Sequence, residues 1–321
     1  MPRSTATFPR SRRFAAGLAS LVLFGLAGCG SGEEATTAAP AGVTDLSQQA
    51  QLQPSFSPDD ALRALLPQAV RDSGVVKTAT SVGLPPINFP GATAAEVKGL
   101  NADLTSAVAQ LLGVKFSSEI YPSTAAQLLA LDSGRIDLTT STNGDTKARQ
   151  AKYDFIDTTL SRNVLMIKSG NPAKIASATD VCGKKFGEVK GSTSVLPKLQ
   201  KVCQGAGRPA PELSSFDDIP SMQLALISGR IDTYVGSDFN VVWDKSRGKP
   251  VDSVALPEAG TLVLGWTLPK GHDGLRDAVL GALQKVRQNG YYAQVFQRWG
   301  VAGNLLDPGV NIGAKGTGFG G

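Results

Sequence analysis

The sequence predicts an α/β protein of two lobes, and a repeated segment is the main observation behind this prediction. Residues 130–137 (ALDSGRID) recur as residues 225–232 (ALISGRID) with a single change. In each copy a glycine closes an apolar helix by taking the left-handed conformation, and a strand then begins. A chain of 321 residues is long enough for two such units to form two lobes, each a mixed sheet flanked by helices.

Charge and composition restrict the functional classes. The hydrophobic content of 41% and the charged content of 18% are typical of a soluble globular protein. The formal net charge is +5, but the first 28 residues carry four arginines and no acidic residue, so the remainder has a net charge of +1. This weak residual charge argues against nucleic-acid binding.

Residues 1–28 have the anatomy of a secretory signal, with a basic start, an apolar stretch and small residues before a cleavage point. The sequence Leu-Ala-Gly-Cys that ends at Cys29 resembles the bacterial lipobox, in which the cysteine is lipidated. We therefore expect a lipoprotein signal peptide over 1–28 and an anchor on Cys29. The alternative is an ordinary cleaved signal with an incidental cysteine, and both Sec and twin-arginine export remain open.

Two terminal segments lack the apolar residues that a core needs. Residues 29–56 are rich in Gly, Ser, Ala, Thr, Pro and Gln, and we expect a flexible tether there. Residues 309–321 are rich in glycine, and we expect a disordered tail.

The remaining cysteines, Cys182 and Cys203, are expected to form a disulfide, because an exported chain meets an oxidising compartment. Two free buried thiols are the alternative. The only histidine is His272, in a Lys-Gly-His-Asp-Gly turn, so a metal site has little support and we expect no metal or cofactor.

The first lobe is predicted over residues 57–163 and 263–308. Residues 57–60 (Ser-Pro-Asp-Asp) are typical of a helix start, and Leu62, Leu65, Leu66 and Val70 after them lie on one helical face. Residues 75–80 are predicted to form the first core strand. A second helix follows Asp103, and Thr124 with Gln127 has capping-box spacing before the helix that ends in the first repeat. A strand at 136–139 follows.

The second lobe is predicted over residues 164–262, with strands at 164–168, 185–189 and 231–235 and helices after Val195 and Asp218. Residues 164–168 and 262–267 are candidate strands for crossing between the lobes. The helical stripes at 275–286 and 292–299 contain Tyr292, Phe296 and Trp299, which we interpret as core residues rather than a ligand platform.

The loop at 140–149 is the best candidate for ligand chemistry, because ligands of open α/β sheets bind beyond the carboxyl ends of strands. Arg149 offers a bidentate fork for a carboxylate, and residues 145–149 form a helix start whose amides attract anions. The alternative is that Arg149 forms a surface ion pair with Asp145 or Asp154.

Two segments of the second lobe are further candidates. The amides and hydroxyls of residues 191–194, including Ser192 and Thr193, could close on the same ligand, or these two residues could simply cap a helix. Asp238 follows the strand of the second repeat and could balance a ligand ammonium group, or it could be a solvated loop aspartate. No general base with an orienting partner is evident, so we expect no catalysis.

Several short motifs occur in an order that resembles a known family. They are Leu84-Pro-Pro-Ile-Asn-Phe89, Gly99-Leu-Asn-Ala-Asp103, the first repeat through Arg149, Tyr153-Asp-Phe155, Gly191-Ser-Thr-Ser194, the second repeat, and the terminal segment 290–299. Together they resemble the extracytoplasmic solute-binding proteins of polar amino-acid ABC transporters (family 3), which have the periplasmic-binding-protein type 2 fold. The resemblance covers about residues 61–301, and the cysteine pair is similar to that of lipoprotein members from high-GC Gram-positive bacteria. It implies a ligand clamped between two lobes that are joined by two crossing strands.

The resemblance also implies roles for single residues. The arginine matching Arg149 holds the carboxylate of the ligand, helped by the positions of Thr142 and Gly144 and, from the other lobe, Thr193. Leu84 and Thr124 replace the aromatic pair that usually sandwiches the ligand, and Ser237 replaces the acid that usually binds the ammonium group, with Asp238 one residue further on. The predicted ligand-binding set is Ser81, Leu84, Thr124, Thr142, Gly144, Arg149, Ser192, Thr193, Ser237 and Asp238.

We therefore expect a lipid-anchored binding protein on the outer face of the cell membrane, not an enzyme. It would capture a small carboxylate-bearing solute, most simply an amino acid, and deliver it to an ABC permease. The alternatives are a dehydratase-like enzyme on the same scaffold and a ligand-sensing or partner-docking lipoprotein.

Overall fold

The computed structural model describes residues 45–93, 95–190 and 195–313. The predicted signal peptide, Cys29, Ser192 and Thr193 therefore lie outside the described residues. Within the described ranges, no helix is long and apolar enough to span a membrane.

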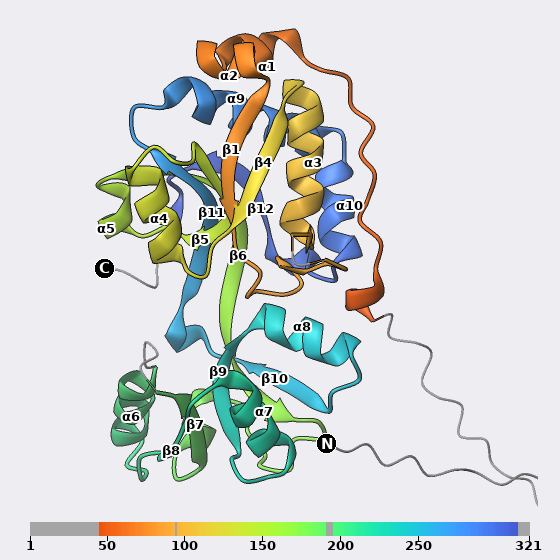
Figure 1. The fold of residues 1–321 in the computed structure, drawn as a ribbon. Helices are drawn as coiled ribbons and strands as arrows, with labels where there is room; N and C mark the ends of the chain where they lie inside the picture. The colour runs from red at the N-terminus through yellow and green to blue at the C-terminus, as the bar shows by residue number, and fades with distance from the viewer. Residues whose placement is uncertain (1–44, 94, 191–194, 314–321) are drawn as a thin grey trace, which may run out of the picture. The chain divides into compact units, whose positions relative to one another are not determined.

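Lobe 1 is built on a mixed sheet (Figure 1). Its strands lie in the order β4 (Lys115–Ile120), β1 (Val75–Thr80), β5 (Leu138–Gly144), β11 (Thr261–Pro269) and β6 (Tyr153–Lys168), with β12 (Leu305–Val310) also paired to β6. Strands β4, β1 and β5 are parallel, whereas β11 and β12 run antiparallel to their partners.

Helices cover both faces of this sheet. The main apolar core of lobe 1 lies beneath α3 (Leu100–Leu112), α9 (Asp273–Gln288) and α10 (Tyr291–Arg298), and a smaller core lies beneath α4 (Thr124–Asp132). Tyr292, Phe296 and Trp299 are fully buried in the main core, which confirms their predicted role. The remaining elements are α1 (Asp60–Leu65), α2 (Gln68–Ser73), β2 (Phe89–Pro90), β3 (Val97–Lys98), α5 (Lys147–Gln150), and the 3-10 turns η1 (Leu46–Gln48) and η4 (Ala302–Asn304).

Lobe 2 repeats the plan on a smaller scale. Strand β6 continues into it and pairs with β9 (Thr233–Ser237), which is followed by β7 (Lys185–Val189) and β8 (Glu212–Phe216), while β10 (Val251–Ala255) lies on the other side of β6. Strands β7, β8 and β9 are parallel. The surrounding elements are α6 (Leu196–Gly205), α7 (Ile219–Ile227), α8 (Asp238–Ser246), η2 (Ala178–Val181) and η3 (Pro257–Ala259).

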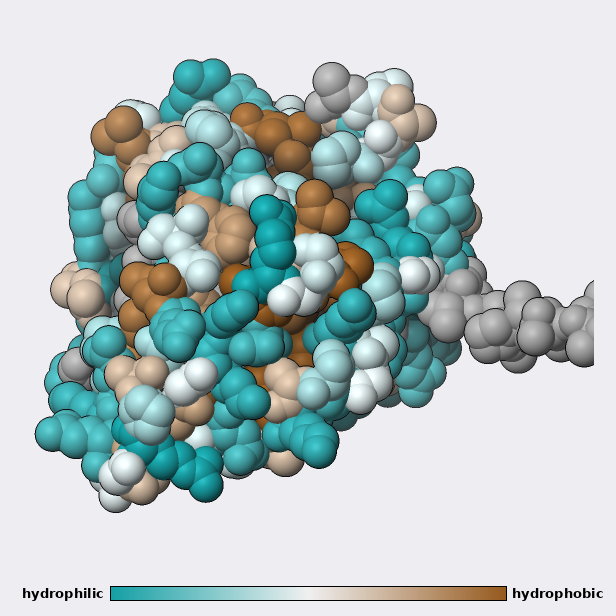
Figure 2. All heavy atoms as spheres, turned by 90° about the horizontal axis from the view of Figure 1, so that it is seen from below, coloured by the Kyte–Doolittle hydropathy of each residue, from teal (hydrophilic) through white to brown (hydrophobic). Residues whose placement is uncertain are grey.

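Figure 2 shows the molecule from below as a largely hydrophilic surface on which hydrophobic side chains form separate patches. In lobe 2, large exposed apolar side chains belong to Leu213, Ile219 and Leu224.

The predicted disulfide is present. Cys182 and Cys203 are joined with an S–S distance of 2.06 Å and a Cα–Cα distance of 5.5 Å. The bond ties the end of η2 to α6, so the alternative of two free thiols does not hold.

The two repeats form the same local structure, as predicted. Gly134 and Gly229 close α4 and α7 with φ values of 67° and 76°, a region that an L side chain enters only at a cost. The aspartate that ends each repeat then fastens the chain to the neighbouring strand, since Asp137 accepts from Lys77 N at 2.8 Å and Asp232 accepts from Lys185 N at 2.9 Å. This link explains why β5 and β9 begin after the aspartate rather than before it.

Two segments expected to be flexible are ordered in part. Residues 45–56 form a strap along lobe 1, in which Leu46 is buried and Leu52 N donates to Asp103 Oδ1 at 3.0 Å. The tether prediction is therefore wrong for 45–56. At the other end, Ile312 N and Gly313 N donate to Asp157 and Asp145 at 2.7 and 2.8 Å, so the disordered-tail prediction is wrong for 309–313.

Candidate functional site

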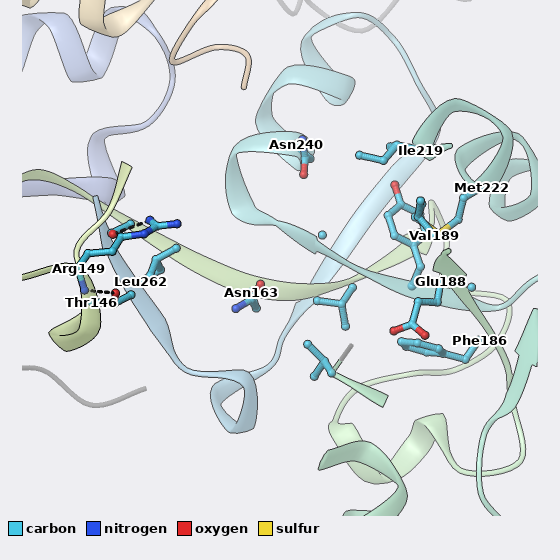
Figure 3. Close-up of a pocket in the computed structure, with 16 residues that line it drawn as sticks. Thr146, Arg149, Asn163, Phe186, Glu188, Val189, Ile219, Met222, Asn240 and Leu262 are labelled. Carbon is cyan, nitrogen blue, oxygen red and sulfur yellow. Dashed lines mark hydrogen bonds between the residues drawn. The ribbon is translucent and has the colours of Figure 1, made fainter. Parts of the chain in front are cut away.

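A cavity of about 690 Å³ is lined by residues of both lobes. Lobe 1 and its connections contribute Gly144, Thr146, Arg149, Asn163 and Leu262. Lobe 2 contributes Phe186, Gly187, Glu188, Val189, Val195, Ile219, Met222, Tyr234, Val235, Gly236 and Asn240. In Figure 3, Arg149 and Leu262 lie on one side of the pocket, Glu188, Val189 and Ile219 lie on the other, and Asn163 lies between them. The cavity lies at the carboxyl ends of β5 and β9, the strands that come after the two repeats. Ligands of open α/β sheets bind at such strand ends.

Arg149 supplies the positive charge of the lobe 1 wall. Its Nη1 donates to Gly144 O at 2.9 Å, and its backbone N donates to Thr146 Oγ1 at 3.4 Å (Figure 3). Helix α5 spans only Lys147–Gln150, so its end contributes little dipole and the guanidinium is the main anion-binding group. The hydrogen bond from Nη1 to the Gly144 carbonyl fixes the orientation of the guanidinium group. The other N–H donors of the guanidinium remain available to a ligand carboxylate.

The alternative for Arg149, an ion pair with Asp145 or Asp154, is not found. Asp145 accepts from Gln150 Nε2 at 2.7 Å, and Asp154 pairs with Lys270 and Arg276 at 3.0 and 3.1 Å. Within the described part of the chain, no carboxylate lies within ion-pair distance of Arg149.

A buried polar network holds the strand that leads to Arg149. Asn143 Nδ2 donates to Thr139 Oγ1 at 3.0 Å and to Thr267 Oγ1 at 3.3 Å, which joins β5 to β11. Gln127 Nε2 donates to Ser141 Oγ at 3.0 Å from α4. Because each buried polar group has a partner, the network fixes β5 and hence Gly144.

This network also corrects a capping prediction. Ser123, not Thr124, caps α4, since Ser123 Oγ accepts from Ala126 N at 3.2 Å. Gln127 turns inward instead of completing a capping box. Thr124 Oγ1 donates to Asn143 Oδ1 at 3.0 Å, so it supports the network from the first turn of the helix.

The other described lobe 1 residues of the predicted set do not line the cavity. Ser81 Oγ contacts Ser141 Oγ at 3.2 Å. Leu84 packs against the main core of lobe 1 and pairs with Asn88. Thr142 is a partly buried residue on β5, between Ser141 and Asn143. Of the predicted set, Gly144 and Arg149 line the cavity.

Ser237 and Asp238 have structural partners at the start of α8. Ser237 caps the helix, and Asn240 Oδ1 accepts from Ser237 N at 3.1 Å to complete a capping box. The Asp238 carboxylate accepts from Arg162 N at 3.1 Å and from Asn304 Nδ2 at 2.6 Å, and it pairs with the Arg162 guanidinium at 3.4 Å. Neither residue lines the cavity.

The predicted set includes none of the described lobe 2 residues that line the cavity, and its Ser192 and Thr193 lie outside the described residues. Glu188 lies at the carboxyl end of β7, so the strand-end rule used for Arg149 would also have selected it. Tyr234 gave no such signal, because its place in the cavity depends on tertiary packing. Burial raises the pKa of the Tyr234 hydroxyl above its ordinary value, and the neighbouring Gln223 opposes part of this rise. Within the described ranges, no hydrogen bond of acceptable geometry reaches that hydroxyl.

Comparison with known proteins finds relatives that are named as amino-acid-binding proteins. The chain is 24% identical to the arginine-binding protein ArgT of Corynebacterium glutamicum over 254 residues, which cover 78% of this chain and 82% of that protein. It is 27% identical to the L-cystine-binding protein TcyJ of Escherichia coli K12 over 232 residues, which cover 72% and 84%.

Similar solved structures include those of amino-acid-binding proteins. An ancestral arginine-binding protein bound to arginine matches with a TM-score of 0.53 and 28% identity, over 70% of this chain and 98% of that one. An ancestral cationic amino acid solute-binding protein matches with a TM-score of 0.59 at 24% identity, over 74% and 99%, and supports the two-lobed fold. The model of the family described as bacterial extracellular solute-binding proteins, family 3, matches residues 76–302. With this match over most of its length, two lobes and a cavity between strand ends, the chain belongs to the family 3 bacterial extracellular solute-binding proteins.

Proposed function

We propose that this protein binds an amino acid between its lobes, with the carboxylate on Arg149, and delivers it to an ABC transporter permease. The observation that carries the proposal is the Arg149 guanidinium, which lines a cavity between strand ends and is held by a carbonyl rather than by an acid. The relatives named for arginine and L-cystine binding support the ligand class.

The remaining roles follow the same proposal. Gly144 presents its backbone N–H beside Arg149, and Thr142, Ser192 and Thr193 assist in carboxylate binding. In this proposal Ser81, Leu84 and Thr124 would limit the bulk of the ligand. The protein is held at the outer face of the membrane by lipid on Cys29.

The test is calorimetric titration of the Arg149→Ala variant with each standard amino acid. Removing the partner of a buried carboxylate costs about 2 to 5 kcal/mol, which weakens binding by about 30- to 5,000-fold. Arg135→Ala is the matched control, because Arg135 is 66% exposed and pairs with Glu119 on the surface. Equal affinities of the Arg149→Ala variant and the unchanged protein would remove Arg149 from the site.

A further inference from the structure

We infer that Glu188 binds a cationic nitrogen of the ligand, so that the cavity selects small zwitterions with the carboxylate on Arg149. This inference rests on the proposed function and adds the second half of the site. It assigns the cation-binding role to β7 of lobe 2 rather than to the start of α8, where the family resemblance places it.

The charges of the cavity carry the inference. Among the described lining residues, Arg149 is the only basic side chain and Glu188 is the only acidic one. They come from different lobes, and Figure 3 shows them on opposite sides of the pocket. A ligand that contacts both walls therefore meets one positive and one negative group, which is the pattern that complements a zwitterion.

Glu188 is available for this role. Within the described part of the chain, its carboxylate has no ion pair or hydrogen bond, and the basic residue two positions further along, Lys190, pairs with Asp217 at 2.7 Å. Glu188 is partly buried in an apolar wall that includes Phe186 and Val195. A carboxylate in such surroundings loses solvation without gaining a partner. A cation in the cavity would supply that partner.

Asp238 is a poor alternative for the same role. Its carboxylate already accepts from Arg162 and Asn304, and it does not line the cavity. To reach a ligand, the Asp238 carboxylate would have to give up its hydrogen bonds from Arg162 and Asn304. Because Asn304 is buried, water could not replace Asp238 as the acceptor for its amide group.

The space between the two charges favours a ligand with an apolar body. The other side chains around it are largely aliphatic or aromatic: Phe186, Val189, Val195, Ile219, Met222, Val235 and Leu262. A cavity of about 690 Å³ admits a side chain as well as the two charged ends. The cationic nitrogen can therefore be an α-ammonium group or a side-chain cation, and the experiment has to distinguish them.

Titration calorimetry on the purified protein and its Glu188→Gln variant tests the inference. The probes are the standard amino acids, followed by two kinds of analogue of the tightest binder. The 2-hydroxy acid lacks the α-ammonium group, and for a cationic amino acid the neutral isostere (citrulline for arginine) lacks the side-chain charge. Glu212→Gln is the matched control, since Glu212 is an exposed residue at the start of the neighbouring β8.

We expect Glu188→Gln to weaken binding of the amino acid about 10- to 100-fold, because a charge-assisted hydrogen bond is lost. The analogue that lacks the nitrogen held by Glu188 should bind the unchanged protein more weakly and lose nothing further in the variant. Glu188→Gln affinities equal to those of the unchanged protein, or an equal loss for all analogues, would overturn the role of Glu188. If Arg149→Ala still abolished binding, the proposed function would stand. Failure of the unchanged protein to bind any amino acid would instead overturn the proposed function.

Discussion

At the residue scale, a buried pair of acids joins the loop at 140–149, which carries Asp145, to β6, which carries Asp157. Asp157 is fully buried and Asp145 is 2% exposed. Asp157 Oδ2 accepts from Ile312 N, while its Oδ1 has no partner in the described structure. Burial, together with the neighbouring Asp145 carboxylate, raises the pKa of Asp157 to about 8. The pair therefore holds a proton that the unfolded chain releases at neutral pH.

This proton makes stability depend on pH. A carboxyl group whose folded pKa is raised favours the folded state below its unfolded pKa, and the benefit disappears as the pH rises to about 8. Between about pH 6.5 and 8.5 the free energy of unfolding should fall by about 1 to 2 kcal/mol. Burial also raises the pKa of Asp103, but only to about 6, so this second group contributes little to the change in stability above pH 6.5.

Urea unfolding at the two pH values measures this fall directly. Asp157→Asn should remove most of it, because the amide is neutral at both pH values. Asp217→Asn is the control at an 83% exposed side chain. A variant with the same pH dependence as the unchanged protein would show that Asp157 is not the titrating group.

At the element scale, the strap of residues 45–56 is a part of lobe 1. Leu46 is 6% exposed and packs in the main core, and Gln110 fastens the strap by accepting from Phe56 N at 2.9 Å and donating to Pro54 O at 3.1 Å. Arg298 Nε donates to Ala50 O at 2.8 Å from α10. The strap thus joins α3 to α10 and covers their shared edge.

Leu46→Ala tests the strap. Loss of a buried leucine costs about 2 to 5 kcal/mol, with the lower end expected for a peripheral site. The thermal midpoint should fall by roughly 2 to 4 °C per kcal/mol. Leu65→Ala, at a leucine that is 45% exposed, should change it little. An unchanged midpoint in Leu46→Ala would mean that the strap does not contribute to the folded core.

The elements that could be predicted from sequence are those whose signals are local. Strands β1 and β7 have the predicted bounds, and the repeat turns have the predicted left-handed glycines. Strand β6 was predicted as 164–168 but begins at Tyr153, because buried polar residues such as Thr158 and Thr159 hide its first part. The strap was missed because its few apolar side chains are spaced too widely to form a pattern.

In the site, too, local sequence signals identify some residues, whereas the roles of others depend on tertiary packing. Arg149 could be predicted because it follows a repeat strand by a few residues. Glu188 satisfies the same rule, but only the folded chain shows that it faces the cavity without a partner. Asp238 looked suitable in the sequence, yet packing gives it Arg162 and Asn304 as partners.

At the scale of the whole described unit, β6 runs through both lobes, the segment from β10 to β11 returns the chain to lobe 1, and α8 bridges the lobes. Strand β6 pairs with β11 over residues 153–162 and with β9 over residues 163–166. Helix α8 follows a lobe 2 strand but places Phe239 in the main core of lobe 1, and Trp243 contacts Phe89 with ring centroids 4.7 Å apart. The cavity wall from lobe 2 is thus linked to lobe 1 through both strand pairing and apolar contact.

The most direct test of amino-acid binding at Arg149 is thermal unfolding of the purified protein against the standard amino acids. A ligand at 100 times its dissociation constant adds about 2.7 kcal/mol, which raises the midpoint by roughly 2 to 4 °C per kcal/mol. We predict a clear rise with one group of amino acids and its loss in Arg149→Ala. No rise with any amino acid, or an equal rise in Arg149→Ala, would contradict the account.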